Sequence, residues 1–219
     1  MEPNYDLAAT RAMEILVARH IVDTPISSMP ILRDFPGVRI MSFSNMADIS
    51  EIDRSDLIPM FGFNQDAVTF RMTDLPGVEY VVIYNMQLPH EEIRRSIARE
   101  LGHIVLGHDG QTRPVDVRMA EALCFAHHLL TPRPIVQMIR QSGIPFTMNV
   151  LSHTTGCSAD CVEELQTIPG VHVDPNLNRR VRDLFAPHIL EYIRFHVSAP
   201  KIDRSPVIDF GTYMDNYEE

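Results

Sequence analysis

The feature that most restricts the fold of this 219-residue chain is an amphipathic helix predicted over residues 90–108. Pro89, Glu91 and Glu92 are typical of a helix start, because proline suits the first turn and acids favour the positive end of the helix dipole. Apolar side chains at helical spacing predict one core-facing stripe: Ile93, Ile97, Leu101, Ile104 and Val105. The other side holds four polar residues: Ser96, Arg99, Glu100 and His103. These indicate either a solvated face or the wall of a cleft.

Three residues of this polar side have the spacing of a metal-binding signature. In H-E-x-x-H on a helix, two histidines four residues apart bind Zn²⁺, and the glutamate between them acts as the general base of a peptidase. Glu100 and His103 stand in the frame of E-x-x-H, whereas Arg99 stands at the position of the first histidine. Arginine stays protonated and has no lone pair for a metal. The pattern therefore predicts peptidase ancestry with an altered metal site.

A second amphipathic helix is predicted over residues 116–131, before a proline-containing stop. Its buried stripe comprises Met119, Leu123, Ala126 and Leu130. Glu121 lies opposite that stripe, and Cys124 and His128 share a face with it at i+3 and i+7. Two helices that each bury one stripe and present a polar face are expected to bring the polar faces together at a cleft.

Three segments together resemble the ImmA/IrrE family of bacterial and phage metallopeptidases: VIYN at 82–85, RRSIARELGHIVLGH at 94–108 and EALCFAHHLLTP at 121–132. That family has a strand ending in Asn, a helix with H-E-L-G-H and a second helix with E-A-N-x-F-A-x-x-L-L-x-P. The resemblance extends over residues 35–132. It implies an α+β fold with a minimal zincin-like core, zinc held by two histidines and one glutamate, and site-specific cleavage of a repressor-type transcription factor.

The resemblance also implies a role for each matching position. Glu100 matches the general base, His103 the second histidine ligand and Glu121 the third metal ligand. Two positions depart from the family pattern, because Arg99 replaces the first histidine and Leu123 replaces the Asn of E-A-N. The first departure removes a ligand and adds a cation beside the metal position.

Two residues are candidates to compensate for the lost ligand. Cys124, as a thiolate, is the candidate substitute ligand, although a small half-buried cysteine is the commoner case. Arg99 offers a planar, permanently charged fork suited to a carboxylate, and an unpaired buried carboxylate is costly. We therefore predict that Arg99 pairs with Glu121; the alternative is an Arg99 that points into solvent. His108 is interpreted as a helix-end residue, and His127 as lying nearer the buried stripe.

The rest of the chain predicts an α+β order. A helix at residues 5–20 is followed by three β-like runs, at 38–44, 66–73 and 79–85. The last two runs flank a Pro-Gly turn signal, which favours a small, antiparallel sheet packed on helices. Beyond residue 132, several short helices are expected between glycine and proline breaks.

These elements divide the chain into three parts. Residues 1–132 are predicted to form the zincin-like core, and residues 133–197 a helical extension packed on that core. Residues 198–219 form an acidic, proline-containing tail that is either disordered or docked through its apolar residues.

Composition restricts the setting and the partners. Three cysteines, an odd number, argue against a disulfide scaffold and favour a reducing cytoplasm. A net charge of −10 argues against a nucleic-acid surface, and no apolar run is long enough to span a membrane. The expected partner is therefore a protein or peptide, with no direct nucleic acid and no membrane. The oligomeric state is not predicted.

His153, Cys157 and Cys161 recur at a spacing of four, which would align a soft metal site on one continuous helix. Gly156 interrupts that run, and Ser158 is typical of an N-cap that opens a new helix. A DNA-reading helix is disfavoured here because the segment is acidic and lacks Lys and Arg. A packing role is the preferred interpretation.

Two functions remain open at this stage. The first is a zinc metalloendopeptidase that cleaves a regulatory, repressor-like protein, with Glu100 activating a water molecule. The second is a catalytically inactive pseudopeptidase that binds a protein or peptide in the cleft without a metal. Zinc is the expected cofactor in the first case, and none is expected in the second.

Overall fold

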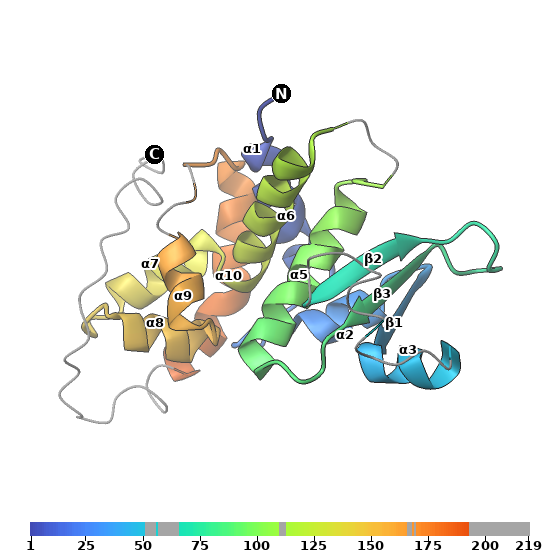
Figure 1. Cartoon of the computed structure of the whole chain (residues 1–219). Coiled ribbons are helices and arrows are strands. Elements are labelled where there is room, and N and C mark those ends of the chain that lie inside the picture. The colour runs from blue at the N-terminus through green and yellow to red at the C-terminus, as the bar shows by residue number, and fades with distance from the viewer. Residues whose placement is uncertain (51–55, 57–65, 110–112, 166–167, 169, 193–219) are drawn as a thin grey trace.

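The computed structural model describes residues 1–50, 56, 66–109, 113–165, 168 and 170–192. A small sheet lies at one side of the molecule, and a larger group of helices occupies the other (Figure 1). The elements α5 (His90–Val105) and α6 (Val115–Leu130) lie between these two parts. The predicted α+β class with a C-terminal helical region is confirmed.

The sheet has three strands in the order β1-β3-β2, with β1 at Val38–Ser42, β2 at Ala67–Arg71 and β3 at Tyr80–Tyr84. β2 pairs with β3 in antiparallel fashion, as expected from the intervening turn, in which Gly77 has a φ of 74°. β1 pairs with β3 in parallel. The expectation of a wholly antiparallel sheet is therefore wrong for β1. The chain between β1 and β3 is long enough to bring β3 back in the same direction as β1, as a parallel pair requires.

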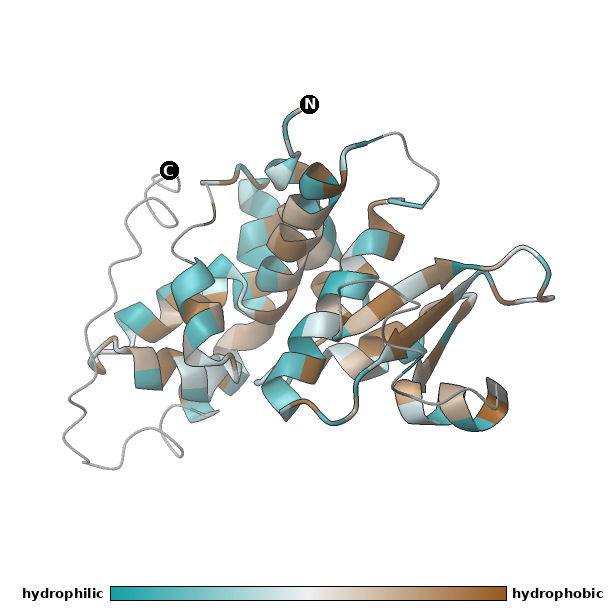
Figure 2. Cartoon of the chain, viewed as in Figure 1, coloured by the Kyte–Doolittle hydropathy of each residue, from teal (hydrophilic) through white to brown (hydrophobic). Residues whose placement is uncertain are grey.

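The two faces of the sheet contact different cores. Tyr80 and Val82 of β3 belong to the main hydrophobic cluster, whereas Val81 and Ile83 pack with Phe43, the first residue of α3 (Phe43–Ser50). This alternation follows from side chains that point to opposite faces of a strand. The central strand is thus apolar on both sides, as its colour in Figure 2 shows.

α5 and α6 pack in unusually close contact at Gly102. A Cβ atom added there would lie 3.0 Å from a ring carbon of Phe125 and 3.2 Å from the carbonyl oxygen of Ala122. The glycine of the E-L-G-H segment therefore allows the two helices to approach. Their polar residues are brought near one another as a result.

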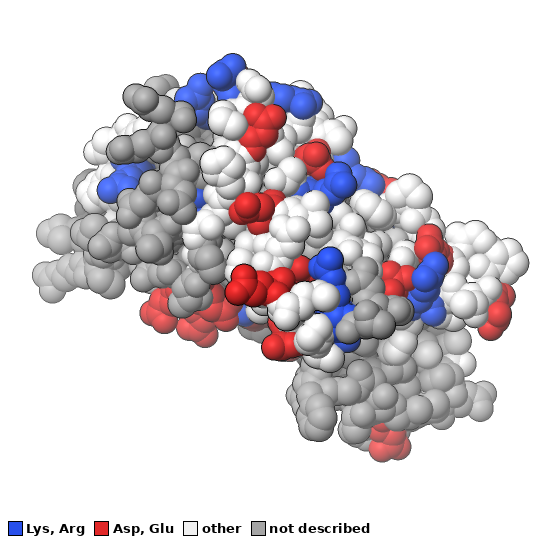
Figure 3. Space-filling view, turned by 90° about the horizontal axis from the view of Figure 1, so that it is seen from above, with Lys and Arg blue, Asp and Glu red and all other residues white. Residues whose placement is uncertain are grey.

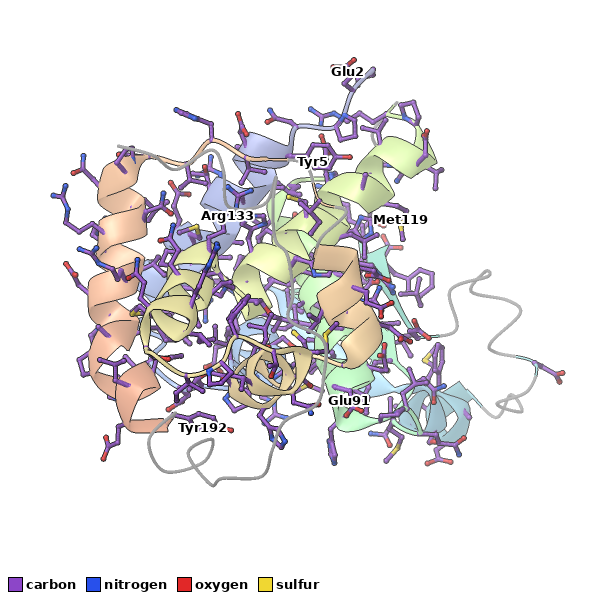
Figure 4. The ribbon with its side chains drawn as sticks, turned by 90° about the vertical axis from the view of Figure 1, so that its left-hand side faces the viewer. Glu2, Tyr5, Glu91, Met119, Arg133 and Tyr192 are labelled. Atoms are coloured by element: carbon purple, nitrogen blue, oxygen red, sulfur yellow. The ribbon has the colours of Figure 1, made fainter. Side chains whose placement is uncertain are left out.

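The remaining helices complete the hydrophobic core. α1 (Tyr5–Ala18) packs against α6, and α2 (Ser28–Arg33) packs against α5. The described residues after α6 form four helices: α7 (Arg133–Gln141), α8 (Met148–Thr155), α9 (Ala159–Leu165) and α10 (Pro175–Tyr192). α10 packs on both α7 and α1, and Arg133 at the start of α7 is buried within this group (Figure 4).

Most of the predicted elements are confirmed, including the helix at 5–20 and the short helices after residue 132. The division into a core, a helical extension and a tail stays a prediction, and the tail lies outside the described residues. Among the described helices, none is both long and apolar enough to cross a membrane.

Candidate functional site

A pocket of about 270 Å³ lies between β2, α5 and the first half of α6. Glu100 and His103 of α5 line it together with Thr69 of β2. An ion pair joins Arg71 and Asp109, which also line the pocket, at 2.7 Å. The polar side of α5 is therefore the wall of a pocket, and Glu100 is only 3% exposed. The cleft interpretation is supported over the solvated face.

Glu100, predicted as the general base, has both carboxylate oxygens occupied. Arg99 donates to Oε1 from Nη2 at 3.0 Å and from Nε at 3.2 Å, and Thr69 Oγ1 donates to Oε2 at 2.7 Å. Burial raises the pKa of Glu100 above its ordinary value, although the Arg99 charge and the Thr69 hydrogen bond oppose this. The carboxylate is thus held in an internal ion pair.

The predicted pair between Arg99 and Glu121 is not formed. The Arg99 guanidinium points toward β2, where Nη2 donates to the carbonyl oxygen of Ala67 at 3.3 Å. Glu121 is instead neutralised by Arg113, whose Nη1 lies 2.9 Å from both carboxylate oxygens. The prediction was wrong about the partner because it left out Arg113, which follows α5 in the chain and supplies the charge that Glu121 needs.

His103 and Glu121, the two predicted metal ligands, are joined through a third residue. His108 Nδ1 lies 2.9 Å from His103 Nδ1, and His108 Nε2 lies 2.9 Å from Glu121 Oε2. The backbone N–H of Asn4 also donates to Glu121 Oε1 at 2.8 Å. We call Glu121, His108 and His103 the pocket cluster. The imidazole of His108 occupies the space between the two ligand positions.

The charges of the pocket cluster follow from burial. Burial and the nearby His108 lower the pKa of His103 to about 3, and burial also lowers the pKa of His108. Both imidazoles are therefore neutral at pH 7. Burial alone would raise the pKa of Glu121, but hydrogen bonds from Asn4 and His108 and the Arg113 charge outweigh it and lower that pKa.

The turn that ends α5 places His108. The N–H of His108 donates to the carbonyl of His103 at 2.9 Å, the N–H of Gly107 donates to that of Ile104 at 3.1 Å, and Gly107 has a φ of 64°. This is a Schellman motif, which returns the chain toward the last turn of the helix. His108 lies at the end of α5, as interpreted, but the turn also brings it against His103 and Glu121, and Gly107 was the sequence signal that could have revealed this.

Cys124, the candidate substitute ligand, lies away from the pocket. Its thiol donates to the carbonyl of Tyr5 at 3.6 Å and lies 3.6 Å from His128 Nδ1. Burial raises the pKa of Cys124 to about 12, which keeps it a thiol. Figure 4 shows Tyr5 at the start of α1. The structure does not bring Cys124 together with His103 and Glu121.

The side chains at the expected metal position do not fit zinc. A catalytic zinc site needs three donors that converge on one point. Here Arg99 cannot donate a lone pair, and Glu121 already accepts from Arg113 and His108. Within the described part of the chain, no group of three or more His, Cys, Asp or Glu side chains is arranged to hold a metal ion.

The comparison with protein families now identifies the class. Residues 38–150 match the family model of the IrrE N-terminal-like domain, Peptidase M78. The chain belongs to this metallopeptidase-like family, so the resemblance seen in the sequence is confirmed. Neither the curated proteins nor the solved structures give a match to the chain.

A second polar cluster lies outside the pocket, where α9 meets α5 and α6. Cys157 and Cys161 are buried there, whereas His153 is exposed on α8, so these three residues do not share a site. The predicted N-cap is confirmed, because Ser158 Oγ accepts from the N–H of Cys161 at 3.2 Å. We call Cys157, Cys161, His127 and Glu164 the thiol cluster.

Proposed function

We propose that this chain is a catalytically inactive, metal-independent member of its family that binds an extended segment of a regulatory protein in the pocket. One observation carries this proposal: the Arg99 guanidinium, at the first-ligand position, is paired with the Glu100 carboxylate. A general base needs a free lone pair directed at its substrate. The residue at the first-ligand position is thus engaged with the residue at the general-base position.

Electrostatics support the metal-independent state. Arg99 is 7% exposed and Glu100 is 3% exposed, so the pair is buried. Removing one partner of a buried ion pair costs roughly 3–5 kcal/mol. A divalent cation would have to approach a fixed guanidinium and also displace His108 from Glu121. The existing side chains already provide the positive charge that zinc would supply.

The open edge of β2 supports binding of an extended segment. The N–H of Met72 donates to the carbonyl oxygen of Glu79, and the N–H of Asn85 donates to the carbonyl oxygen of Asp66. Because antiparallel pairing alternates, the backbone groups of Ala67, Thr69 and Arg71 point away from β3, and of these the Ala67 carbonyl already accepts from Arg99. Among the described residues, no strand pairs with that edge. A peptide added there would lie along the pocket, in the manner of β-strand addition.

The charges on one face of the molecule and in the pocket favour a protein partner. On the face in Figure 3, acidic and basic side chains are intermixed among uncharged residues. The pocket also contains both signs, since Arg118 and Arg71 line it together with Asp109 and Glu100. A nucleic-acid surface would instead need clustered positive charge.

Zinc binding and peptide binding together test this proposal. We expect equilibrium dialysis to find well below one zinc per wild-type chain. We also expect selection from a phage-displayed library of random peptides to enrich extended sequences that bind the wild-type protein. Thr69→Pro, which removes an edge N–H, should abolish that binding, whereas the control Thr69→Val keeps the N–H and should preserve it.

The alternative is an active zinc metalloendopeptidase that cleaves a repressor-like protein. Family membership favours it, as does the gathering of Glu100, His103 and Glu121 on facing helices. About one zinc per chain, with cleavage that Glu100→Gln abolishes, would establish this alternative and overturn the proposal. Failure to enrich any peptide would contradict the binding function.

A further inference from the structure

The thiol cluster gathers two cysteine thiols beside hydrogen-bonding and charged groups. Cys157 follows Gly156, the left-handed residue that ends α8, and Cys161 lies in the first turn of α9. The two thiols interact closely enough for each to shift the pKa of the other. All three cysteines of the chain are free thiols. This pair lies outside the pocket and plays no part in the function proposed above.

Three groups act on the Cys157 sulfur. Thr131 Oγ1 lies 3.1 Å from Cys157 Sγ, and Arg94 Nη2 lies 3.9 Å from it. Arg94 approaches so closely that a Cβ at Gly156 would lie 2.5 Å from its Nη1, so glycine makes room for the guanidinium. The hydrogen bond from the Cys161 thiol, with these neighbours, lowers the pKa of Cys157 well below its ordinary value despite burial.

Cys161 has a proton acceptor beside it. His127 Nδ1 lies 3.8 Å from Cys161 Sγ, and His127 Nε2 lies 3.4 Å from Glu164 Oε2. Arg95 Nη2 holds Glu164 at 2.6 Å. The carboxylate on Nε2 fixes the tautomer that leaves Nδ1 as an acceptor toward the thiol. The interpretation of His127 as a stripe residue thus left out its polar role.

We propose that Cys157 and Cys161 are a site of reversible oxidation by a hydroperoxide, with Cys157 as the nucleophile and Cys161 as the resolving thiol. Both side chains are buried, at 4% and 2% exposure. That burial favours an oxidant as small as hydrogen peroxide over a bulky disulfide. The pair shares with redox-sensitive cysteines a thiolate next to a second cysteine, but it is buried where those are solvent-accessible.

The chemistry balances in two steps. The Cys157 thiolate attacks one peroxide oxygen, the O–O bond breaks, and Cys157 becomes a sulfenic acid as hydroxide leaves. Cys161 passes its proton through His127 to that hydroxide, and its sulfur then attacks the Cys157 sulfur. A disulfide forms and a second hydroxide leaves, which takes a proton from solvent. Overall, two thiols and one hydrogen peroxide give one disulfide and two water molecules.

Cys124 is a matched internal control. It is as buried as the other two cysteines, yet burial raises its pKa to about 12 despite the charge of Arg133, and its sulfur contacts the Tyr5 carbonyl oxygen and the His128 ring. A buried thiol of this kind is inert. Accessibility alone therefore does not distinguish the cysteines, whereas their chemical surroundings do.

The test is graded hydrogen peroxide on the folded, full-length protein, with free glutathione in the same tube. We expect two of the three thiols to be lost together, faster than glutathione is oxidised, and to return with dithiothreitol. Peptide mapping should show a Cys157–Cys161 disulfide and a reduced Cys124. Cys161→Ser should stop at a Cys157 sulfenic acid that dimedone traps, and Cys124→Ser should respond like the wild type.

Oxidation of the pair no faster than glutathione, or loss of Cys124 at the same rate, would overturn the proposal. Because these readouts use the wild-type protein, the test does not depend on whether each variant folds. Neither result would bear on peptide binding in the pocket, so the two proposals fail separately.

Discussion

The pocket cluster and the thiol cluster share one arrangement and differ in their surroundings. In each, a glutamate of a helix accepts from a histidine ring, and an arginine neutralises that glutamate. Glu121 in the pocket cluster is 2% exposed, whereas the Glu164 side chain in the thiol cluster is 42% exposed. The first carboxylate is therefore essential to the packing around it, while water screens the second. The same local pattern therefore stabilises the fold in the pocket cluster, whereas in the thiol cluster it lies beside the cysteines that we propose to be reactive.

Removing the buried carboxylate should have the largest effect on stability. Glu121→Ala would leave Arg113, His108 and the Asn4 N–H without their shared acceptor. We expect the free energy of unfolding to fall by about 3 kcal/mol, at the low end for breaking a buried pair because Arg113 is partly exposed. Urea denaturation measures this. A loss below about 1 kcal/mol, the range of surface pairs, would remove the contrast between the clusters.

Restoring the family ligand should reveal whether the pocket cluster still blocks metal. Arg99→His removes the cation and completes H-E-L-G-H, so we expect zinc affinity to rise. His108 would still separate His103 from Glu121, and Arg99→His with His108→Ala should therefore bind zinc roughly 100-fold more tightly than the wild type, on the scale of changes around a metal site. Equilibrium dialysis measures both. No gain in the double variant would mean that the pocket has diverged further.

The lowered pKa of His103 predicts a loss of stability in acid. The folded pKa of about 3 lies below the unfolded value of about 6.5, so the unfolded chain takes up a proton first as the pH falls. The contribution of His103 to the free energy of unfolding is fully present above pH 6.5 and is lost as the pH falls from 6.5 to 3. By pH 5, His103 should account for a loss of about 2 kcal/mol, at about 1.4 kcal/mol per unit. His103→Gln should flatten this slope in urea titrations, and an unchanged slope would contradict the assignment.

The smallest effect is expected at the exposed carboxylate. Glu164→Ala removes a partly exposed partner of Arg95 and His127, and such pairs are worth about 0–1 kcal/mol. We expect the free energy of unfolding, measured with urea, to change by less than about 1 kcal/mol, and circular dichroism to show an intact fold. Disulfide formation between Cys157 and Cys161 should slow at the same time, because His127 loses its orienting partner. A large loss of stability would show that the thiol cluster is structural.

The periodic parts of the fold were predictable from the sequence, and so was much of the site. The helical spacing of α5 and α6 was enough to place Glu100, His103 and Glu121 on facing surfaces. The parallel pairing of β1 was not predictable, since a short apolar strand gives no sign of its direction. His108 and Arg113 were missed for a related reason: both lie between the helices, where a single glycine turn decides the path of the chain.

The close approach of α5 and α6 at Gly102 has a mechanical consequence. A ring carbon of Phe125 lies only 3.0 Å from where a Cβ would stand, so no larger residue fits at Gly102 unless the two helices move apart. β2 packs on α5, and among the described strands it pairs with β3. An incoming chain paired with β2 would therefore lie beside a helical wall whose spacing is set by one glycine.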